Sequence, residues 1–157
     1  SNMSIARLKA RTPSAVALGC YRLEAHDLRF HKLSDDGSGK CDAFSTDNND
    51  DFILGVVFEI DPIEKAHLDR IEGLGYGYDE KEVIVSAADG SLCNAVTYIA
   101  VRIDKAVKPY FWYVNHVLIG AKEMGLPVAY IQQKITAIQS IEDPDQARDA
   151  EQRAIYD

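Results

Sequence analysis

Basic residues are scarce in this chain of 157 residues, which has 17 Lys and Arg against 25 Asp and Glu and a formal net charge of −8. Nucleic acids and anionic membrane surfaces are bound by basic faces, so this charge balance argues against both kinds of partner. Long apolar runs are also missing, since stretches such as Ala95–Val101 fall far short of the roughly 20 residues that span a bilayer. No basic segment leading into an apolar stretch opens the sequence, and we therefore expect a cytoplasmic protein without a secretory signal.

Cysteine is also rare: Cys20, Cys41 and Cys93 form no C-x-x-C pair. An odd number of widely spaced cysteines is typical of reduced thiols in a cytoplasmic protein. The histidines do not supply ligands at the short spacing that a zinc site requires. His26 and His31 flank a strand-like stretch and could meet, but solvated or core positions are the simpler interpretation. We therefore expect no metal site.

The remaining composition, with 46% hydrophobic and 27% charged residues, is that of a globular domain with a core of its own. Alternating apolar residues between positions 15 and 33 predict one long strand or a bent pair of strands. The run Phe52–Ile60 predicts a central strand, because nearly every position in it is apolar. Glu82–Ala87 and Leu92–Ile103, separated by a turn, predict a hairpin.

Helices are predicted around these strands. A short one covers Ser4–Ala10, and another begins at Asp61-Pro62 and ends at Glu72, before Gly73. The strongest helical pattern consists of Tyr110, Tyr113, Val114, Val117, Leu118 and Ala121, and a further helix follows from Val128 to about Gln139. We therefore expect an α+β domain over residues 1–139, followed by an acidic helix or tail over residues 140–157.

Glu72 stands out on physical grounds. It follows Leu68 by four residues, so the two side chains share one face of the predicted helix. If that face packs on the sheet, the carboxylate points inward, where partial burial and the C-terminal end of the helix dipole both disfavour its charged form. Such a carboxylate is suited to proton transfer near neutral pH. If the helix is rotated instead, Glu72 is simply exposed, and the spacing alone does not decide between the two.

The sequence around Glu72 resembles a known family. The L-D-x-x-E-G…Y segment of the γ-glutamylcyclotransferase-like family is similar to Leu68-Asp69-Arg70-Ile71-Glu72-Gly73, followed by Gly77-Tyr78. Other segments resemble that family in the same order: Ser1-Asn2-Met3, Arg11-Thr12-Pro13-Ser14-Ala15, Gly55–Ile60, Trp112-Tyr113, Gly120-Ala121-Lys122-Glu123, Gly125-Leu126-Pro127 and Tyr130-Ile131. The resemblance covers most of the chain and rests on this ordered set rather than on one motif.

The resemblance implies a small mixed β-barrel with packed helices and a γ-glutamylcyclotransferase activity. Such an enzyme cyclises the γ-glutamyl group of a γ-glutamyl amino acid or amine to 5-oxoproline and releases the amino acid or amine, without a metal or organic cofactor. By position, Glu72 is the general acid and base, and Ser1 and Asn2 end a loop that holds the substrate. Tyr113 is the substrate-contacting tyrosine, although its spacing alone would make it one more core aromatic. Tyr78 is a further candidate for the pocket.

The chain departs from the family at its start, where the apolar first strand and the Tyr-Gly of the substrate loop are absent. We therefore expect the barrel to lack its first strand and to expose a sheet edge, which favours pairing into a homodimer. A small-molecule γ-glutamyl substrate is the other expected partner. The alternative function is a non-catalytic module on the same fold that binds a small ligand or a protein.

Overall fold

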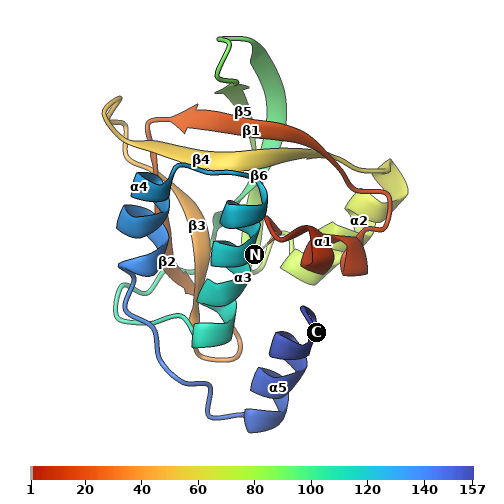
Figure 1. Cartoon of the computed structure of the whole chain (residues 1–157), viewed down its shortest axis with the longest axis vertical. Coiled ribbons are helices and arrows are strands. Elements are labelled where there is room, and N and C mark those ends of the chain that lie inside the picture. The colour runs from red at the N-terminus through yellow and green to blue at the C-terminus, as the bar shows by residue number, and fades with distance from the viewer. Residues whose placement is uncertain (1) are drawn as a thin grey trace.

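The computed structural model describes residues 2–157, and Figure 1 shows how its elements are arranged. In chain order they are α1 (Ile5–Arg11), β1 (Val16–Glu24), β2 (His26–Leu33), β3 (Gly39–Ser45), β4 (Phe52–Glu59), α2 (Pro62–Glu72), β5 (Tyr78–Ser86), β6 (Leu92–Ala100), α3 (Phe111–Glu123), α4 (Val128–Ile131), the π-helical turn η1 (Gln132–Thr136) and α5 (Gln146–Ala154). This is the α+β class that the sequence predicts. Within residues 2–157, no helix combines the length and the apolar character needed to cross a membrane.

Strands β4, β1, β5 and β6 form one sheet in that order, and β2 pairs with β3 in another. The ladders between these strands are antiparallel. β1 pairs with β4 along its whole length, whereas in the described part of the chain it joins β5 at the pair Arg22–Ser86. The sheet therefore splays apart between β1 and β5, and the β5–β6 hairpin projects from it (Figure 1).

The segment from 16 to 33 is a bent pair of strands, one of the two arrangements that its pattern predicts. The chain turns from β1 into β2 at Ala25, whose φ of 57° lies in the left-handed region. The Ala25 N–H donates to the Asp51 carbonyl and the Thr46 N–H donates to the Ala25 carbonyl, each at 2.9 Å. These bonds fix the corner, so that β2 leaves the first sheet and pairs with β3.

The run Phe52–Ile60 forms β4, but the prediction that this strand is central is wrong, because β4 lies at an edge of its sheet. Its apolar residues have neighbours other than strands. Phe52 stacks on Tyr130 with ring centroids 6.0 Å apart, whereas Val56 and Phe58 line a cavity. Contacts with a helical layer and with an apolar cavity give this edge strand the composition of a central one.

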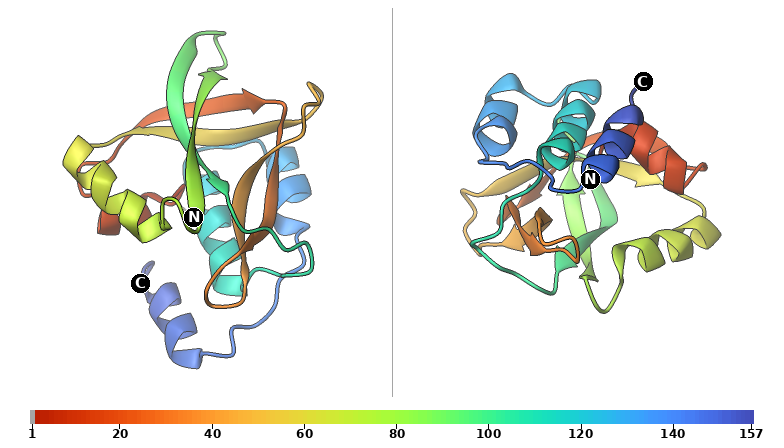
Figure 2. Two further views of the ribbon diagram at one scale, coloured as in Figure 1. Left: turned by 180° about the vertical axis from the view of Figure 1, so that it is seen from behind. Right: turned by 90° about the horizontal axis from the view of Figure 1, so that it is seen from below.

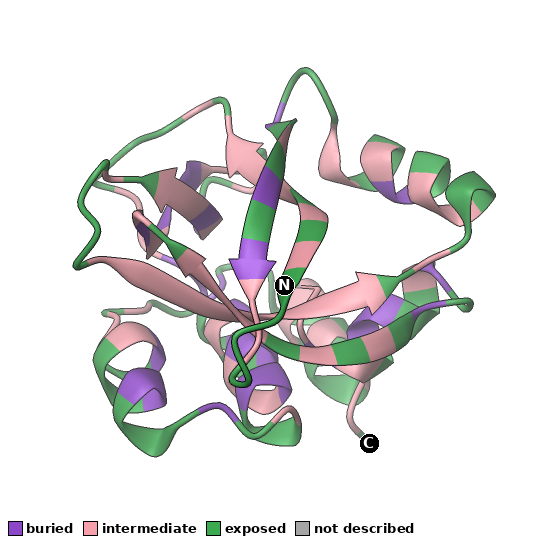
Figure 3. Ribbon diagram, turned by 90° about the horizontal axis from the view of Figure 1, so that it is seen from above, coloured by how far each residue is buried: buried purple, intermediate pink, exposed green. Residues whose placement is uncertain are grey.

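The largest hydrophobic cluster lies where α3, α4 and η1 pack against the sheets. Its buried members are Phe30, Tyr110, Trp112, Tyr113, Val117, Ala121, Leu126, Tyr130, Ile131 and Ile135. The predicted apolar face of α3 supplies several of them, which confirms the pattern read from positions 110–121. Figure 3 shows the same layering by burial, with buried positions on the helices and alternating exposed and half-buried positions along β1 and β6.

A smaller cluster joins α1 to α2 through Leu8, Ala15 and Leu68. Burial of Leu8 and Leu68, at 2% and 5% exposure, orients both helices toward the interior. The segment before α1 is fixed by the buried Ser4, whose side chain accepts from the Arg7 N–H as the N-cap of α1. The start of the described chain therefore lies beside the end of α2.

Helix α5 contacts α3, and its Gln152 accepts a hydrogen bond from Arg7 of α1 at 2.7 Å. The right-hand view of Figure 2 shows α5 on the side of the molecule where α1 lies. Ahead of α5, the buried Asp143 carboxylate accepts from Trp112 Nε1 and from Arg148 Nε, each at 2.7 Å. After the helix, Tyr156 Oη lies 3.1 Å from Ser4 Oγ and is hydrogen-bonded to His116 of α3. The acidic C-terminal segment thus forms an exposed helix whose two ends are anchored to the rest of the chain.

The contacts of His116 predict a pH dependence of stability. Burial and the nearby Arg7 lower the pKa of His116 from 6.5 to about 3. In this range the unfolded chain binds the proton and the folded chain does not, so the free energy of unfolding falls as the pH decreases from 6.5 toward 3. The expected slope is at most about 1.4 kcal/mol per pH unit. Urea unfolding of His116→Asn should show a flatter profile, whereas the exposed His67→Asn should keep the wild-type slope. Equal slopes in both variants would contradict this assignment.

Candidate active site

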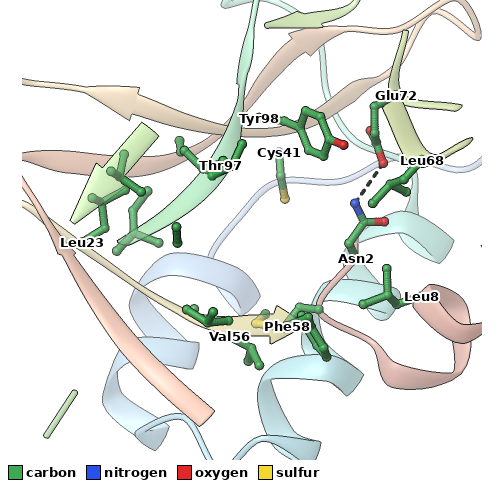
Figure 4. A pocket seen from close by; sticks show the side chains of 18 of the residues that line it. Asn2, Leu8, Leu23, Cys41, Val56, Phe58, Leu68, Glu72, Thr97 and Tyr98 are labelled. Atoms are coloured by element: carbon green, nitrogen blue, oxygen red, sulfur yellow. Dashed lines mark hydrogen bonds between the residues drawn. The ribbon is translucent and has the colours of Figure 1, made fainter. Parts of the chain in front are cut away.

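The sheets and the helices α1 and α2 border a cavity of about 1320 Å³. One end is lined by apolar strand residues that include Leu23 and Val56. The other end is polar, and Figure 4 shows Glu72 and Asn2 facing each other there. The cavity therefore offers an apolar wall and one polar end at which a carboxylate is present.

Local sequence explains why α2 ends with Glu72 at this cavity. The Asp61 side chain accepts from the Ile63 N–H at 2.8 Å and caps the start of the helix, with Pro62 in its first turn. Gly73 ends the helix with a φ of 69°, a conformation that glycine adopts without steric cost. Leu68 and Glu72 lie on one face and both line the cavity, so of the two orientations that the spacing leaves open the structure shows the one in which Glu72 points inward.

Two donors hold the Glu72 carboxylate. Asn2 Nδ2 donates to Glu72 Oε1 at 2.9 Å, and Arg11 Nη1 lies 3.4 Å from the same oxygen. Arg11 Nη1 also donates to Asn2 Oδ1 at 3.2 Å, which closes a triangle of side chains. The Glu72 side chain is 15% exposed, so it remains open to the cavity while its orientation is fixed.

Sequence reasoning brought Asn2 and Glu72 into one site, and the structure places them in contact. It did not single out Arg11 as a site residue, although Arg11 opens one of the segments that resemble the family. Ser1, the other residue expected in the substrate loop, lies outside the described residues. A role for Asn2 in holding the substrate stays a prediction.

Tyr78 and Tyr113 are both buried and both line the cavity. Tyr78 Oη donates to the Cys41 carbonyl at 2.8 Å, and Tyr113 Oη accepts from the Cys41 N–H at 3.0 Å. Burial raises the pKa of both tyrosines well above 10, so their hydroxyls stay neutral. The two rings therefore fix the backbone of β3 at the cavity wall, and contact with a substrate stays a prediction for both.

The histidines considered for a metal site have other partners. His31 Nε2 lies 2.7 Å from Asp42 Oδ2 in a buried pair, and His26 Nδ1 lies 2.7 Å from the Glu24 carbonyl. Across the part of the chain that the structure describes, no three His, Cys, Asp or Glu residues are grouped in a way that could hold a metal ion.

The fold places the chain among proteins of γ-glutamylcyclotransferase type. A solved structure named γ-glutamyl cyclotransferase superposes with a TM-score of 0.86 at 25% identity, covering 99% of this chain and 93% of that one. An uncharacterised protein from Homo sapiens gives the same TM-score at 26% identity, with 99% and 94% of the two chains covered.

Sequence comparison leads to the same group. Residues 52–133 match the AIG2-like family. The γ-glutamylcyclotransferase of Bos taurus is 32% identical over 144 residues, which cover 88% of this chain and 75% of that protein. The corresponding protein of Homo sapiens is 31% identical over the same length. The chain therefore belongs to the AIG2-like, γ-glutamylcyclotransferase-like family, as its motifs predict.

Proposed function

We propose that this chain is a γ-glutamylcyclotransferase with Glu72 as its general acid and base. The enzyme class follows from its similarity to the named relatives of Bos taurus and Homo sapiens. The observation that carries the assignment of Glu72 is a carboxylate at the polar end of the cavity, held by Asn2 and Arg11 and still accessible. The substrate is a γ-glutamyl amino acid or amine.

The reaction requires no nucleophile from the enzyme, because the substrate carries its own. The α-amino nitrogen attacks the γ-carbonyl carbon and closes a five-membered ring, and the bond from that carbon to the leaving nitrogen then breaks. Folding the substrate into this geometry is worth a large part of the rate, since effective molarities of well-oriented intramolecular reactions reach about 10⁵–10⁸ M. The products are 5-oxoproline and the free amine.

In this mechanism Glu72 carries out two proton transfers. As a base, its carboxylate takes a proton from the α-ammonium group, which frees the nitrogen lone pair for attack. As an acid, it returns a proton to the leaving nitrogen, so that the amine departs in a neutral form. The attacking nitrogen loses two protons in all as it becomes the lactam nitrogen, and the second of them passes to solvent. Asn2 orients the carboxylate through its 2.9 Å hydrogen bond. Ser1 and Asn2 are also proposed to contribute backbone amides that bind the substrate, with Tyr113 and Tyr78 as walls of the pocket.

Release of 5-oxoproline tests this function. The purified chain is incubated with a panel of γ-glutamyl amino acids, γ-glutamyl amines and glutathione, and 5-oxoproline is quantified by chromatography. At least one substrate is expected to give product, with release of an equal amount of amine. Heat-denatured protein and substrate alone correct for spontaneous cyclisation. No product from any member of the panel, with protein shown to be folded by circular dichroism, would contradict the proposal.

A further inference from the structure

Lys32 is a buried lysine in the cavity that the proposed reaction does not use. It lies near the end of β2, is 8% exposed to solvent and lines the same cavity as Glu72. Its ammonium lies 4.7 Å from the centroid of the Tyr78 ring, a favourable cation–π contact. The side chain therefore brings a positive charge to the cavity wall.

The surroundings of Lys32 differ from those of the other cations around the cavity. Each of those has a hydrogen-bonding partner in the described chain: Arg7 with Gln152, Arg11 with Glu72, Lys40 with Asp36, and Lys65 with Asp69 and Glu80. Within residues 2–157, the Lys32 ammonium makes neither a hydrogen bond nor an ion pair, and its contact is with the Tyr78 ring. Lys32 is thus the cavity cation whose charge the described residues leave without a polar partner.

Lys32 also lies close to the backbone that follows Glu72. A side-chain carbon placed on Gly77 would lie 3.2 Å from Lys32 Nζ and 3.0 Å from the Glu72 carbonyl oxygen. Lys32 Nζ and the Glu72 carbonyl oxygen therefore both lie close to Gly77, in the loop that follows α2. The charge of Lys32 thus lies near the backbone at the end of α2, close enough for the Glu72 carboxylate to act on the pKa of Lys32.

Most of the Lys32 side chain is buried while its Nζ keeps contact with solvent in the cavity, and this partial loss of hydration is unfavourable for the charged form. Burial lowers the pKa of Lys32, although the carboxylates of Asp35 and Glu72 act in the opposite direction. The chain has 25 acidic residues, yet none of those that the structure describes forms an ion pair with the Lys32 ammonium. An anion that arrives with the ligand would supply the missing partner.

We propose that Lys32 binds a carboxylate group of the substrate. This inference rests on the proposed function, because a γ-glutamyl compound provides the anion. Every such compound has an α-carboxylate, and a γ-glutamyl amino acid has a second carboxylate on its leaving residue. Either group could reach Lys32, and the two sources are distinguished by experiment.

The test compares two substrates that differ in one carboxylate. γ-Glutamylalanine has both carboxylates, whereas γ-glutamylethylamine is the same molecule without the carboxylate of the leaving residue. For Lys32→Met we expect kcat/KM to fall by about 10- to 100-fold, mainly through KM, on each substrate that carries the recognised group. A loss confined to γ-glutamylalanine assigns Lys32 to the leaving residue. Equal losses on both substrates, largely restored in Lys32→Arg, assign it to the α-carboxylate.

The controls separate binding from folding. Lys134 forms an ion pair with Asp27 at 2.7 Å and does not line the cavity, so Lys134→Met should leave both substrates unaffected. The melting temperature of Lys32→Met should be unchanged or raised, because the substitution removes a buried charge. Losses below about threefold on both substrates, or equal losses that Lys32→Arg does not restore, would overturn the assignment. Absence of 5-oxoproline with wild-type protein would instead remove the proposed function itself.

Discussion

Glu72→Gln is expected to slow turnover by about 10²- to 10⁴-fold, with little change in KM. Glutamine keeps the shape of the side chain and one acceptor oxygen for Asn2 Nδ2, so the substrate still meets the same pocket. What it lacks is the ability to take a proton from the α-ammonium group and to return one to the leaving nitrogen. A stopped assay that follows product formation over a range of substrate concentrations separates kcat from KM.

The stability of the Glu72→Gln variant distinguishes a catalytic role of Glu72 from a structural one. The ion pair with Arg11 is long, at 3.4 Å, and both side chains are partly exposed, at 25% and 15%. Its loss should therefore change the free energy of unfolding by about 1 kcal/mol or less. Glu82→Gln removes the same charge from an exposed position at the cavity and should leave kcat unchanged. A destabilised Glu72→Gln with near-normal turnover would mean that Glu72 serves Arg11 and that the proton is moved by another residue.

The parts of the fold that could be predicted from the sequence are those fixed by local rules. The start of α2 follows from Asp61 and Pro62, and its end follows from Gly73, because caps act on residues next to them in the chain. The apolar spacing of 110–121 gives α3 for the same reason. The place of β4 in its sheet depends instead on which strands lie beside it, and the run Phe52–Ile60 contains no information about that.

The residues of the candidate site also differ in whether the local sequence reveals them. Glu72 is found because its helical spacing from Leu68 and the surrounding motif both lie within a few residues. Arg11 could not be recognised, since it meets Glu72 across 61 positions of the sequence, through the packing of α1 on α2. The sequence gives no sign of a role for Lys32 either, because a lysine near the end of an amphipathic strand is usually solvated. Its burial becomes evident only when β2, the loop after α2 and the cavity are assembled.

Gly120→Ala should disrupt the site through the backbone. A Cβ at Gly120 would lie 2.5 Å from the Met3 carbonyl carbon and from the Ser4 nitrogen, which is closer than these atoms can approach. Since the methyl group meets main chain, relief requires movement of the segment Met3–Ser4 away from α3. We expect the free energy of unfolding to fall by about 1–3 kcal/mol, the usual cost of overpacking.

The same movement should reduce activity, because Asn2 directly precedes the displaced segment. Asn2 Nδ2 reaches Glu72 Oε1 at 2.9 Å, and a shift of about 1 Å in a positioning group can lower the rate by about 10²-fold. The kcat/KM of Gly120→Ala should therefore fall by about this factor, measured below the melting temperature so that the protein remains folded.

Gly90→Ala is the matched control. Gly90 lies in the exposed turn between β5 and β6 with a φ of 85°, so an alanine there is strained but contacts nothing within 4 Å. This variant should lose about 1 kcal/mol of stability without a change in kcat/KM. If Gly120→Ala loses stability but keeps wild-type kcat/KM, the contact between α3 and the segment Met3–Ser4 does not position Asn2. If both variants lose activity in proportion to their stability, the loss is global, and the role of the Asn2–Glu72 contact in catalysis must be abandoned.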